Sequence, residues 1–97
     1  MSSADELQFC WDDDKAVANL EKHGVSFEAA TYVFDDPRRL EHEDVFAEAE
    51  YRNIVIGMVD GVVLTVVYAS PEEDVYRIIS ARRATAHEWK AYEKSVL

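Results

Sequence analysis

A chain of 97 residues that is 48% hydrophobic has room for one packed core and excludes a second domain. Its single cysteine, Cys10, excludes an internal disulfide, and the absence of any apolar run near about 20 residues excludes a membrane helix. The first six residues are polar and acidic, with no signal-peptide core after them, so we expect a cytoplasmic location.

The formal net charge of −10 is unevenly distributed along the chain. Residues 1–74 hold five Lys/Arg against eighteen Asp/Glu, whereas residues 75–97 hold five against two. Segments of opposite sign in one small domain predict two contact surfaces. The acidic part offers a field complementary to a basic protein partner, and the arginines near the C-terminus favour an anionic ligand.

The first third of the chain predicts a strand followed by two helices. Residues 7–11 alternate apolar and polar side chains, as a strand does. Aspartates 12–14 supply an N-cap and an acidic first turn to a helix over 15–23, and Gly24 suits the positive φ of a C′ position. One face of this helix is apolar and consists of Ala16, Val17 and Leu20.

A second, short helix is predicted over 27–34, with Ser26 as its N-cap and Asp35-Asp36-Pro37 as its end. Residues 38–42 predict a short edge strand, and residues 43–50 form either an acidic loop or a helical turn. The buried side of the second helix is expected to carry Phe27, Ala30, Thr31 and Phe34.

The second half of the chain predicts three consecutive strands and a final helix. Asp60-Gly61 is the strongest hairpin signal and joins strands over 51–59 and 62–69. A longer turn over 70–74 leads to a strand over 75–82. The last helix opens with the capping box Thr85-Ala86-His87-Glu88, and its inner face is expected to carry Trp89, Tyr92 and Val96.

Strands bracketed by helices predict an α+β fold over residues 1–97. We expect a central antiparallel sheet of four or five strands, flanked by two N-terminal helices and one C-terminal helix. If the turn over 70–74 closes symmetrically and no bulge intervenes, Val67 pairs with Arg77. Arg52 and Arg77 then share one face about 10 Å apart, a separation suited to two adjacent phosphates, and Arg82 lies on the other face.

Three ordered motifs resemble the BrnT toxin family over nearly the whole chain. The first motif comprises Trp11-Asp12 with Lys15 and Asn19, then Lys22-His23-Gly24-Val25-Ser26-Phe27-Glu28 and Val33-Phe34-Asp35-Asp36-Pro37. The second motif is Glu50-Tyr51-Arg52 with Ile56-Gly57. The third motif is Arg77-Ile78-Ile79-Ser80-Ala81-Arg82-Arg83-Ala84 with Glu88 and Tyr92.

The resemblance implies a RelE-like fold and cleavage of messenger RNA without a metal ion or another cofactor. It also implies neutralisation by a cognate BrnA-type antitoxin. Through the ribbon-helix-helix domain of that antitoxin, the complex would bind DNA and repress its own operon. No membrane partner is expected.

Metal-free RNA cleavage needs a base for the 2′-hydroxyl, a cation for the charge on the phosphoryl group and an acid for the leaving oxygen. His23 is the candidate acid or base, because an unperturbed imidazole titrates near neutrality. Glu88 could orient an arginine or act as a base. The candidate catalytic cations are Arg77, Arg82 and Lys22. The further residues expected to bind RNA are Arg52 and Arg83.

Structural alternatives stand beside these roles. His23 ends a helix, where an imidazolium stabilises the dipole, and Glu88 is a capping-box partner for Thr85. The acidic charge also leaves open a binding module on the same fold that has lost efficient cleavage and mainly binds an antitoxin-like protein. A nucleic-acid mimic is the third alternative. No metal site is expected, because residues 41–44 and His23 match no compact ligand spacing.

Overall fold

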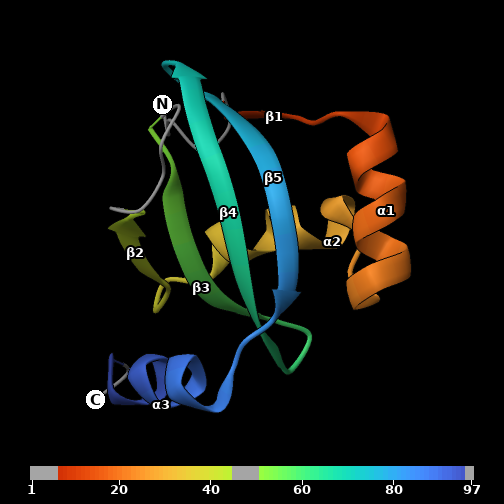
Figure 1. The fold of residues 1–97 in the computed structure, drawn as a ribbon. Helices are drawn as coiled ribbons and strands as arrows, with labels where there is room; N and C mark the ends of the chain where they lie inside the picture. Colours follow the sequence, from red (N-terminus) through yellow and green to blue (C-terminus); the bar gives the residue numbers. More distant parts are fainter. Residues whose placement is uncertain (1–6, 45–50, 96–97) are drawn as a thin grey trace.

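The computed structural model describes residues 7–44 and 51–95, and within them a five-stranded sheet has the strand order β1-β5-β4-β3-β2 (Figure 1). The strands are Gln8–Cys10 (β1), Leu40–Glu43 (β2), Asn53–Val59 (β3), Val62–Glu72 (β4) and Val75–Arg83 (β5). The predicted α+β class is confirmed. The sheet is mixed, however, because β1 pairs with β5 in parallel while the other neighbours are antiparallel. The chain between β1 and β5 supplies the long crossover that a parallel pair requires.

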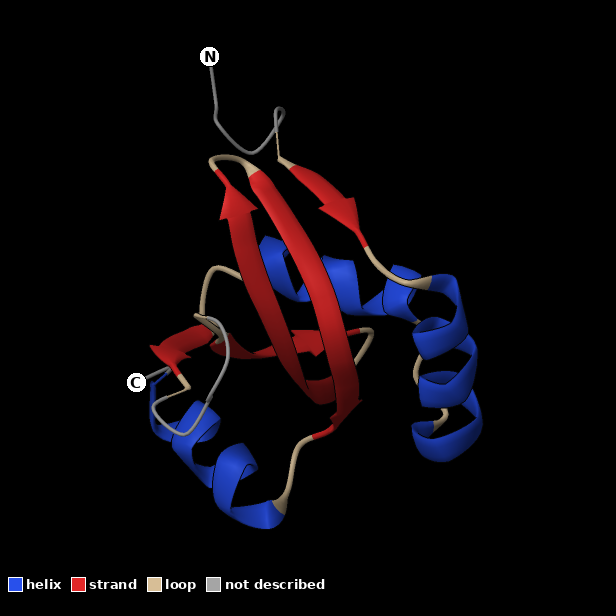
Figure 2. Ribbon diagram, turned by 45° about the horizontal axis from the view of Figure 1, so that its top comes forward, coloured by secondary structure: helices blue, strands red, loops and turns tan. Residues whose placement is uncertain are grey.

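The helices lie around this sheet on different sides. They are Asp13–His23 (α1), Phe27–Thr31 (α2) with the 3-10 helix Tyr32–Asp35 (η2) directly after it, and Ala86–Ser95 (α3). α1 lies beside β5, and α3 lies at the end of the sheet where β5 stops (Figure 1, Figure 2). Among the described residues, no helix is long and apolar enough to cross a membrane.

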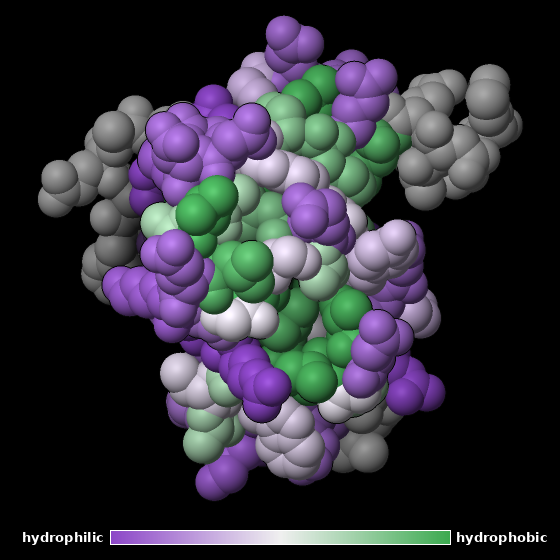
Figure 3. Space-filling model, turned by 90° about the vertical axis from the view of Figure 1, so that its right-hand side faces the viewer, coloured by the Kyte–Doolittle hydropathy of each residue, from purple (hydrophilic) through white to green (hydrophobic). Residues whose placement is uncertain are grey.

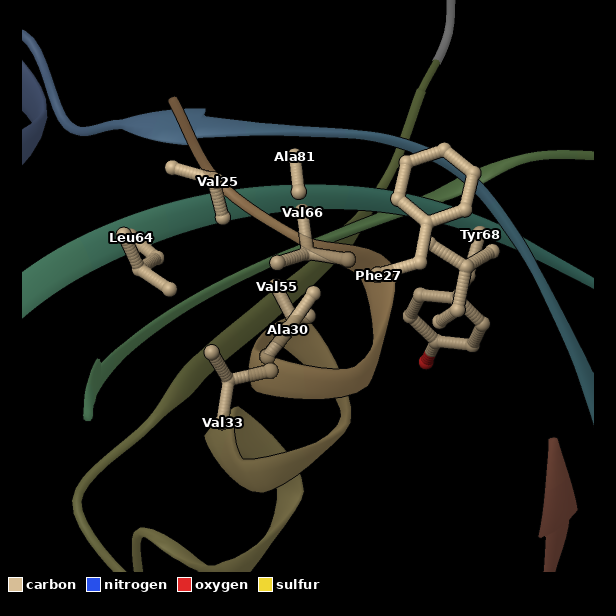
Figure 4. Packing of buried hydrophobic residues seen from close by; sticks show 10 residues of the cluster. Val25, Phe27, Ala30, Val33, Val55, Leu64, Val66, Tyr68 and Ala81 are labelled. Atoms are coloured by element: carbon tan, nitrogen blue, oxygen red, sulfur yellow. The ribbon is translucent and has the colours of Figure 1, made fainter. Parts of the chain in front are cut away.

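The main core lies between the sheet and the α2–η2 segment. Figure 4 shows Ala30 and Val33 gathered with Val55 and Val66, and all four side chains are fully buried. Burying a Val side chain stabilises the fold by about 1.5–3 kcal/mol. A smaller cluster on the opposite face joins the sheet to α3 and consists of Ile56, Val63 and Tyr92. Neighbouring residues of one strand thus face two different helices.

Of the apolar face predicted for α1, Ala16 packs against the main core, whereas the other two residues are largely exposed. Val17 and Leu20 are 59% and 50% exposed, and the buried residue of the helix is Asn19. The Asn19 amide donates to the carbonyl oxygens of Ala81 (2.8 Å) and Val25 (3.0 Å), and its oxygen accepts from the Ala81 N–H (3.2 Å). α1 therefore lies alongside the backbone of β5 beyond the short strand β1. The buried position on α1 therefore requires a side chain that, like a neighbouring strand, can both donate to and accept from the backbone of β5.

The pairing of β4 with β5 differs from the symmetrical turn that we predicted. β4 continues to Glu72 and pairs it with Val75, so the turn is two residues long. Arg77 pairs with Ala69, and an irregularity between Val67 and Tyr68 inserts an extra residue in β5. The prediction that Arg82 lies opposite the face of Arg77 is wrong, because this bulge brings Arg82 into register with Thr65 on that same face.

The last helix begins as predicted but packs through fewer residues. The Thr85–Glu88 capping box is present, since each side chain accepts a hydrogen bond from the backbone N–H of the other. Tyr92 is buried, whereas Trp89 is 46% exposed, so its predicted inward position is wrong. Val96 and the part of the acidic segment from residue 45 to 50 lie outside the described residues.

Candidate functional site

A pocket of about 260 Å³ opens where the start of α1 approaches β5 and the residues preceding β3. The residues that line it are Asp12, Lys15, Arg52, Arg77, Ile78 and Ile79. We call this the cationic pocket. It gathers three cationic side chains and one carboxylate in a protein whose net charge is −10. Arg52 and Arg77 are brought together here, as their predicted shared face required.

Local sequence positions the helical wall of the cationic pocket. The parallel pairing of β1 with β5 sets Cys10 opposite Arg77, so the chain leaves β1 and enters α1 next to Arg77. Asp12 is the N-cap of α1, and its Oδ1 accepts a hydrogen bond of 3.1 Å from the N–H of Lys15. The first turn therefore carries Asp12 and Lys15 to the pocket, together with the positive end of the helix dipole.

The sheet wall is built on either side of Ala69. Ala69 of β4 pairs with Arg77 of β5. On its other side, the last pair of the β3–β4 register is Asn53 with Tyr68, so the preceding residue, Arg52, lies opposite Ala69. Two strand spacings, about 10 Å, separate the two arginine backbones. Both arginines are half-buried. A guanidinium in a partly desolvated pocket binds a phosphate through parallel, charge-assisted hydrogen bonds, so this wall suits a phosphodiester.

Arg82 is engaged by Glu88 rather than by the cationic pocket. Its two terminal nitrogens donate to the two Glu88 carboxylate oxygens at 2.7 and 3.0 Å, and the side chains are 38% and 20% exposed. Thr65 Oγ1 and the N–H of Thr85 also donate to Glu88. The Arg82 hydrogen bonds, with those from the two threonines, lower the pKa of Glu88 to about 2. Glu88 is therefore a weak base at neutral pH that holds Arg82 in place.

His23, Lys22 and Arg83 lie toward the other end of α1 and β5. His23 and Lys22 are in the last turn of α1, which ends at Gly24 with φ 70°. Eight residues separate Lys15 from His23, which corresponds to about 12 Å of helix. The residues that line the cationic pocket do not include His23, Lys22, Arg82 or Arg83. The predicted group of His23, Arg77 and Arg82 is thus divided among three locations: the last turn of α1, the cationic pocket and the Glu88 pair.

A larger cavity, about 850 Å³, lies elsewhere and has a different character. Its lining includes three aspartates, Asp35, Asp36 and Asp60, against one arginine, Arg38. Asp36 accepts hydrogen bonds from Tyr92 Oη (2.6 Å) and from the N–H of Met58 (2.8 Å). Although burial opposes it, these bonds lower the pKa of Asp36, so its carboxylate stays ionised. This cavity repels a phosphate, and the smaller cationic pocket is the better candidate site.

Sequence reasoning missed Asp12 and Lys15 as site residues. Their spacing within one helical turn was visible, and they are part of the first family motif, but they were interpreted only as a cap and a motif residue. Their proximity to Arg77 depends on the pairing of β1 with β5, which joins residues 67 apart (Cys10 with Arg77). In the described parts of the chain, no group of three or more His, Cys, Asp or Glu side chains is arranged to hold a metal ion.

Comparisons with known proteins agree with this fold. The sequence model of one family, described as the ribonuclease toxin BrnT of type II toxin–antitoxin systems, matches residues 11–88. No curated protein sequence matches the chain. Among solved structures, the chain is similar to the Brucella abortus ribonuclease toxin BrnT, determined at 1.1 Å resolution. The TM-score is 0.64 at 22% sequence identity, and the match covers 81% of this chain and 97% of that one.

Proposed function

This chain belongs to the BrnT family, the ribonuclease toxins of type II toxin–antitoxin systems, and we propose that it is a metal-independent endoribonuclease acting in the cytoplasm. Its substrate is single-stranded RNA, which it cuts to inhibit translation. Its partner is a BrnA-like antitoxin with a ribbon-helix-helix domain. The toxin–antitoxin complex binds DNA through that domain. The single observation that supports RNA as the ligand is the convergence of Arg52, Arg77 and Lys15 in one pocket.

In this proposal the cationic pocket binds the scissile phosphate. The 2′-hydroxyl gives its proton to a base and its oxygen attacks phosphorus while the bond to the 5′-oxygen of the next nucleotide breaks. The leaving 5′-oxygen takes up a proton from water, so the products are a 2′,3′-cyclic phosphate and a free 5′-hydroxyl. Arg77 and Arg52, with Lys15, stabilise the negative charge that accumulates on the phosphoryl oxygens. Because these cations are held by a sheet and a helix N-terminus, little reorganisation is needed when that charge forms.

Two groups are candidates for the base that removes the 2′-hydroxyl proton. Asp12 is favoured because it is the single carboxylate among the described residues that line the cationic pocket. His23 is the other candidate, because an imidazole titrates near neutral pH. Asp12→Asn separates the two, since asparagine remains a good N-cap but cannot take up the proton. If Asp12 is the base, Asp12→Asn lowers the rate by about 10²–10⁴ and His23→Gln leaves it unchanged.

The test of the proposed function is cleavage of single-stranded RNA by the purified chain in the presence of EDTA. Arg77→Ala is expected to lower the rate by about 10²–10³, as removal of a group that stabilises transition-state charge does. The matched control is Arg38→Ala, which removes an exposed arginine outside the pocket and should keep the parental rate. Equal rates for the two variants would contradict the site. Urea midpoints measured in parallel separate loss of chemistry from loss of fold.

A catalytically weak binding module remains the alternative function. It is favoured by the observation that two of the predicted catalytic residues, Arg82 and Glu88, are bound to each other and joined to the capping box of α3. On this alternative the folded parental chain does not cleave RNA in EDTA, yet it binds the antitoxin. The same assay therefore decides between the two functions.

A further inference from the structure

α1 carries an apolar stripe that the fold leaves largely exposed. Leu20 lies four residues after Ala16 and three after Val17, so all three lie toward one side of the helix. Helices normally turn such a stripe toward a core. Here the buried side of α1 is occupied by Asn19. The side chain of Val17 is 59% exposed and that of Leu20 is 50% exposed. Among the described residues of the chain, the exposed part of this stripe is thus accessible to another molecule.

The stripe forms one wall of a groove whose other wall is the beginning of α2. The groove has a volume of about 310 Å³ and is lined by Trp11, Asp13, Ala16, Val17, Leu20, Ser26, Phe27 and Glu28. Trp11 and Phe27 make an edge-to-face contact with ring centroids 6.0 Å apart. Figure 3 shows apolar residues gathered on the face of the molecule that carries α1, with hydrophilic residues around them.

Two carboxylates line this groove. Asp13 at the start of α1 and Glu28 at the start of α2 are both exposed and line it. Asp14 and Glu21 add further exposed negative charge on α1. An apolar groove with an acidic edge attracts a segment that has apolar side chains on one side and Lys or Arg on its flanks. The same carboxylates repel the phosphates of RNA.

We propose that the α1–α2 groove is the docking site for an amphipathic helix of the antitoxin, with apolar residues at i, i+3, i+4 and i+7 and basic residues beside them. This inference rests on the proposed function for the existence of the antitoxin and adds where and how it binds. Asp12 and Lys15, which line the cationic pocket, are on the same first turns of α1 as Asp13 and Ala16, which line the groove. A helix seated in the groove therefore lies next to the RNA pocket and obstructs access to it.

The test measures binding of the full chain to the protein encoded by the reading frame adjacent to its gene. Leu20→Glu and Val17→Glu place a charge in the apolar stripe, and each is expected to raise Kd by about 30-fold or more, as loss of a central interface anchor does. The matched control is Trp89→Glu, which alters an exposed apolar side chain on α3 and should leave Kd unchanged. Glu28→Lys should slow association several-fold and weaken its salt dependence, whereas Glu93→Lys should not.

The outcomes separate this inference from the proposed function. Loss of binding in the groove variants, with RNA cleavage at the parental rate and unchanged urea midpoints, supports the docking site. Parental Kd values in Leu20→Glu and Val17→Glu overturn it while leaving the toxin function intact. A change in RNA cleavage without a change in Kd overturns it as well, because the groove would then belong to the RNA site. If the parental chain does not bind the neighbouring protein, the antitoxin part of the proposed function fails and the docking site fails with it.

Discussion

Replacement of Asn19 by alanine is expected to destabilise the protein more than any other single change in α1. The Asn19 side chain makes three hydrogen bonds with the backbone, two to Ala81 and one to Val25, at distances of 2.8 to 3.2 Å. It is 8% exposed, so water is largely excluded from these bonds. Asn19→Ala leaves the N–H and C=O of Ala81 and the C=O of Val25 without this partner. The attachment of α1 to β5 is lost with them.

The magnitude follows from the cost of unsatisfied backbone groups. Each buried donor or acceptor left unpaired costs about 1–3 kcal/mol. Some water can reach the edge of the sheet after truncation, so we expect a total near the low end of the sum, about 3–4 kcal/mol. A small domain has only about 5–15 kcal/mol of net stability. At about 4–8 °C per kcal/mol for a domain of this size, the melting temperature should fall by about 12–30 °C.

Urea unfolding followed by tryptophan fluorescence measures this loss, because Trp11 is half-buried against Phe27 close to α1. The matched control is Glu21→Ala, an exposed position on the same helix, where a change within about 0.5 kcal/mol is expected. A loss below about 1 kcal/mol for Asn19→Ala would refute the view that this amide replaces a neighbouring strand along β5.

Two further predictions concern the joints between the sheet and the other helices. The folded-state pKa of Glu88, about 2, lies below its ordinary 4.5, so the stability it contributes is present above pH 4.5 and is lost as the pH falls toward 2. Glu88→Gln should cost about 1–2 kcal/mol at pH 7, because Arg82 loses its charged partner, and the difference should vanish in urea titrations near pH 2. Gly57→Ala should cost about 1–3 kcal/mol in the same assay, since the added Cβ would lie 3.1 Å from a carbonyl oxygen of η2. A neutral Gly57→Ala would show that η2 can move away from β3.

The elements predicted correctly depend on residues close together in the chain. The Asp60-Gly61 hairpin pairs Val59 with Val62, and both turn residues have positive φ, 49° and 81°. The N-cap at Asp12 and the capping box that opens α3 were also visible as short patterns. A turn or cap is formed by a few neighbouring residues whose hydrogen bonds are nearly the same in any fold.

The candidate site was only partly predictable for the opposite reason. The shared face of Arg52 and Arg77 followed from alternation along two hairpins, although the predicted pairing of Arg77 was displaced by two residues. The contribution of Asp12 and Lys15 required the pairing of β1 with β5, and no local pattern specifies that partner. The engagement of Arg82 by Glu88 required the bulge in β5, which moves Arg82 to the face of Thr65 and α3.

The order of strands and helices, their caps and tight turns, and the family motifs could be predicted from the sequence, because each depends on residues close together in the chain. The side of α1 that faces the sheet, and the set of cations that share a pocket, depend on contacts between distant parts of the chain. An apolar stripe predicts burial but not the element that it packs against. The N–H and C=O groups of Ala81 in β5 need hydrogen-bond partners, and the Asn19 amide supplies them where an apolar side chain could not. The side of α1 that was left exposed is the side that the proposed antitoxin helix covers.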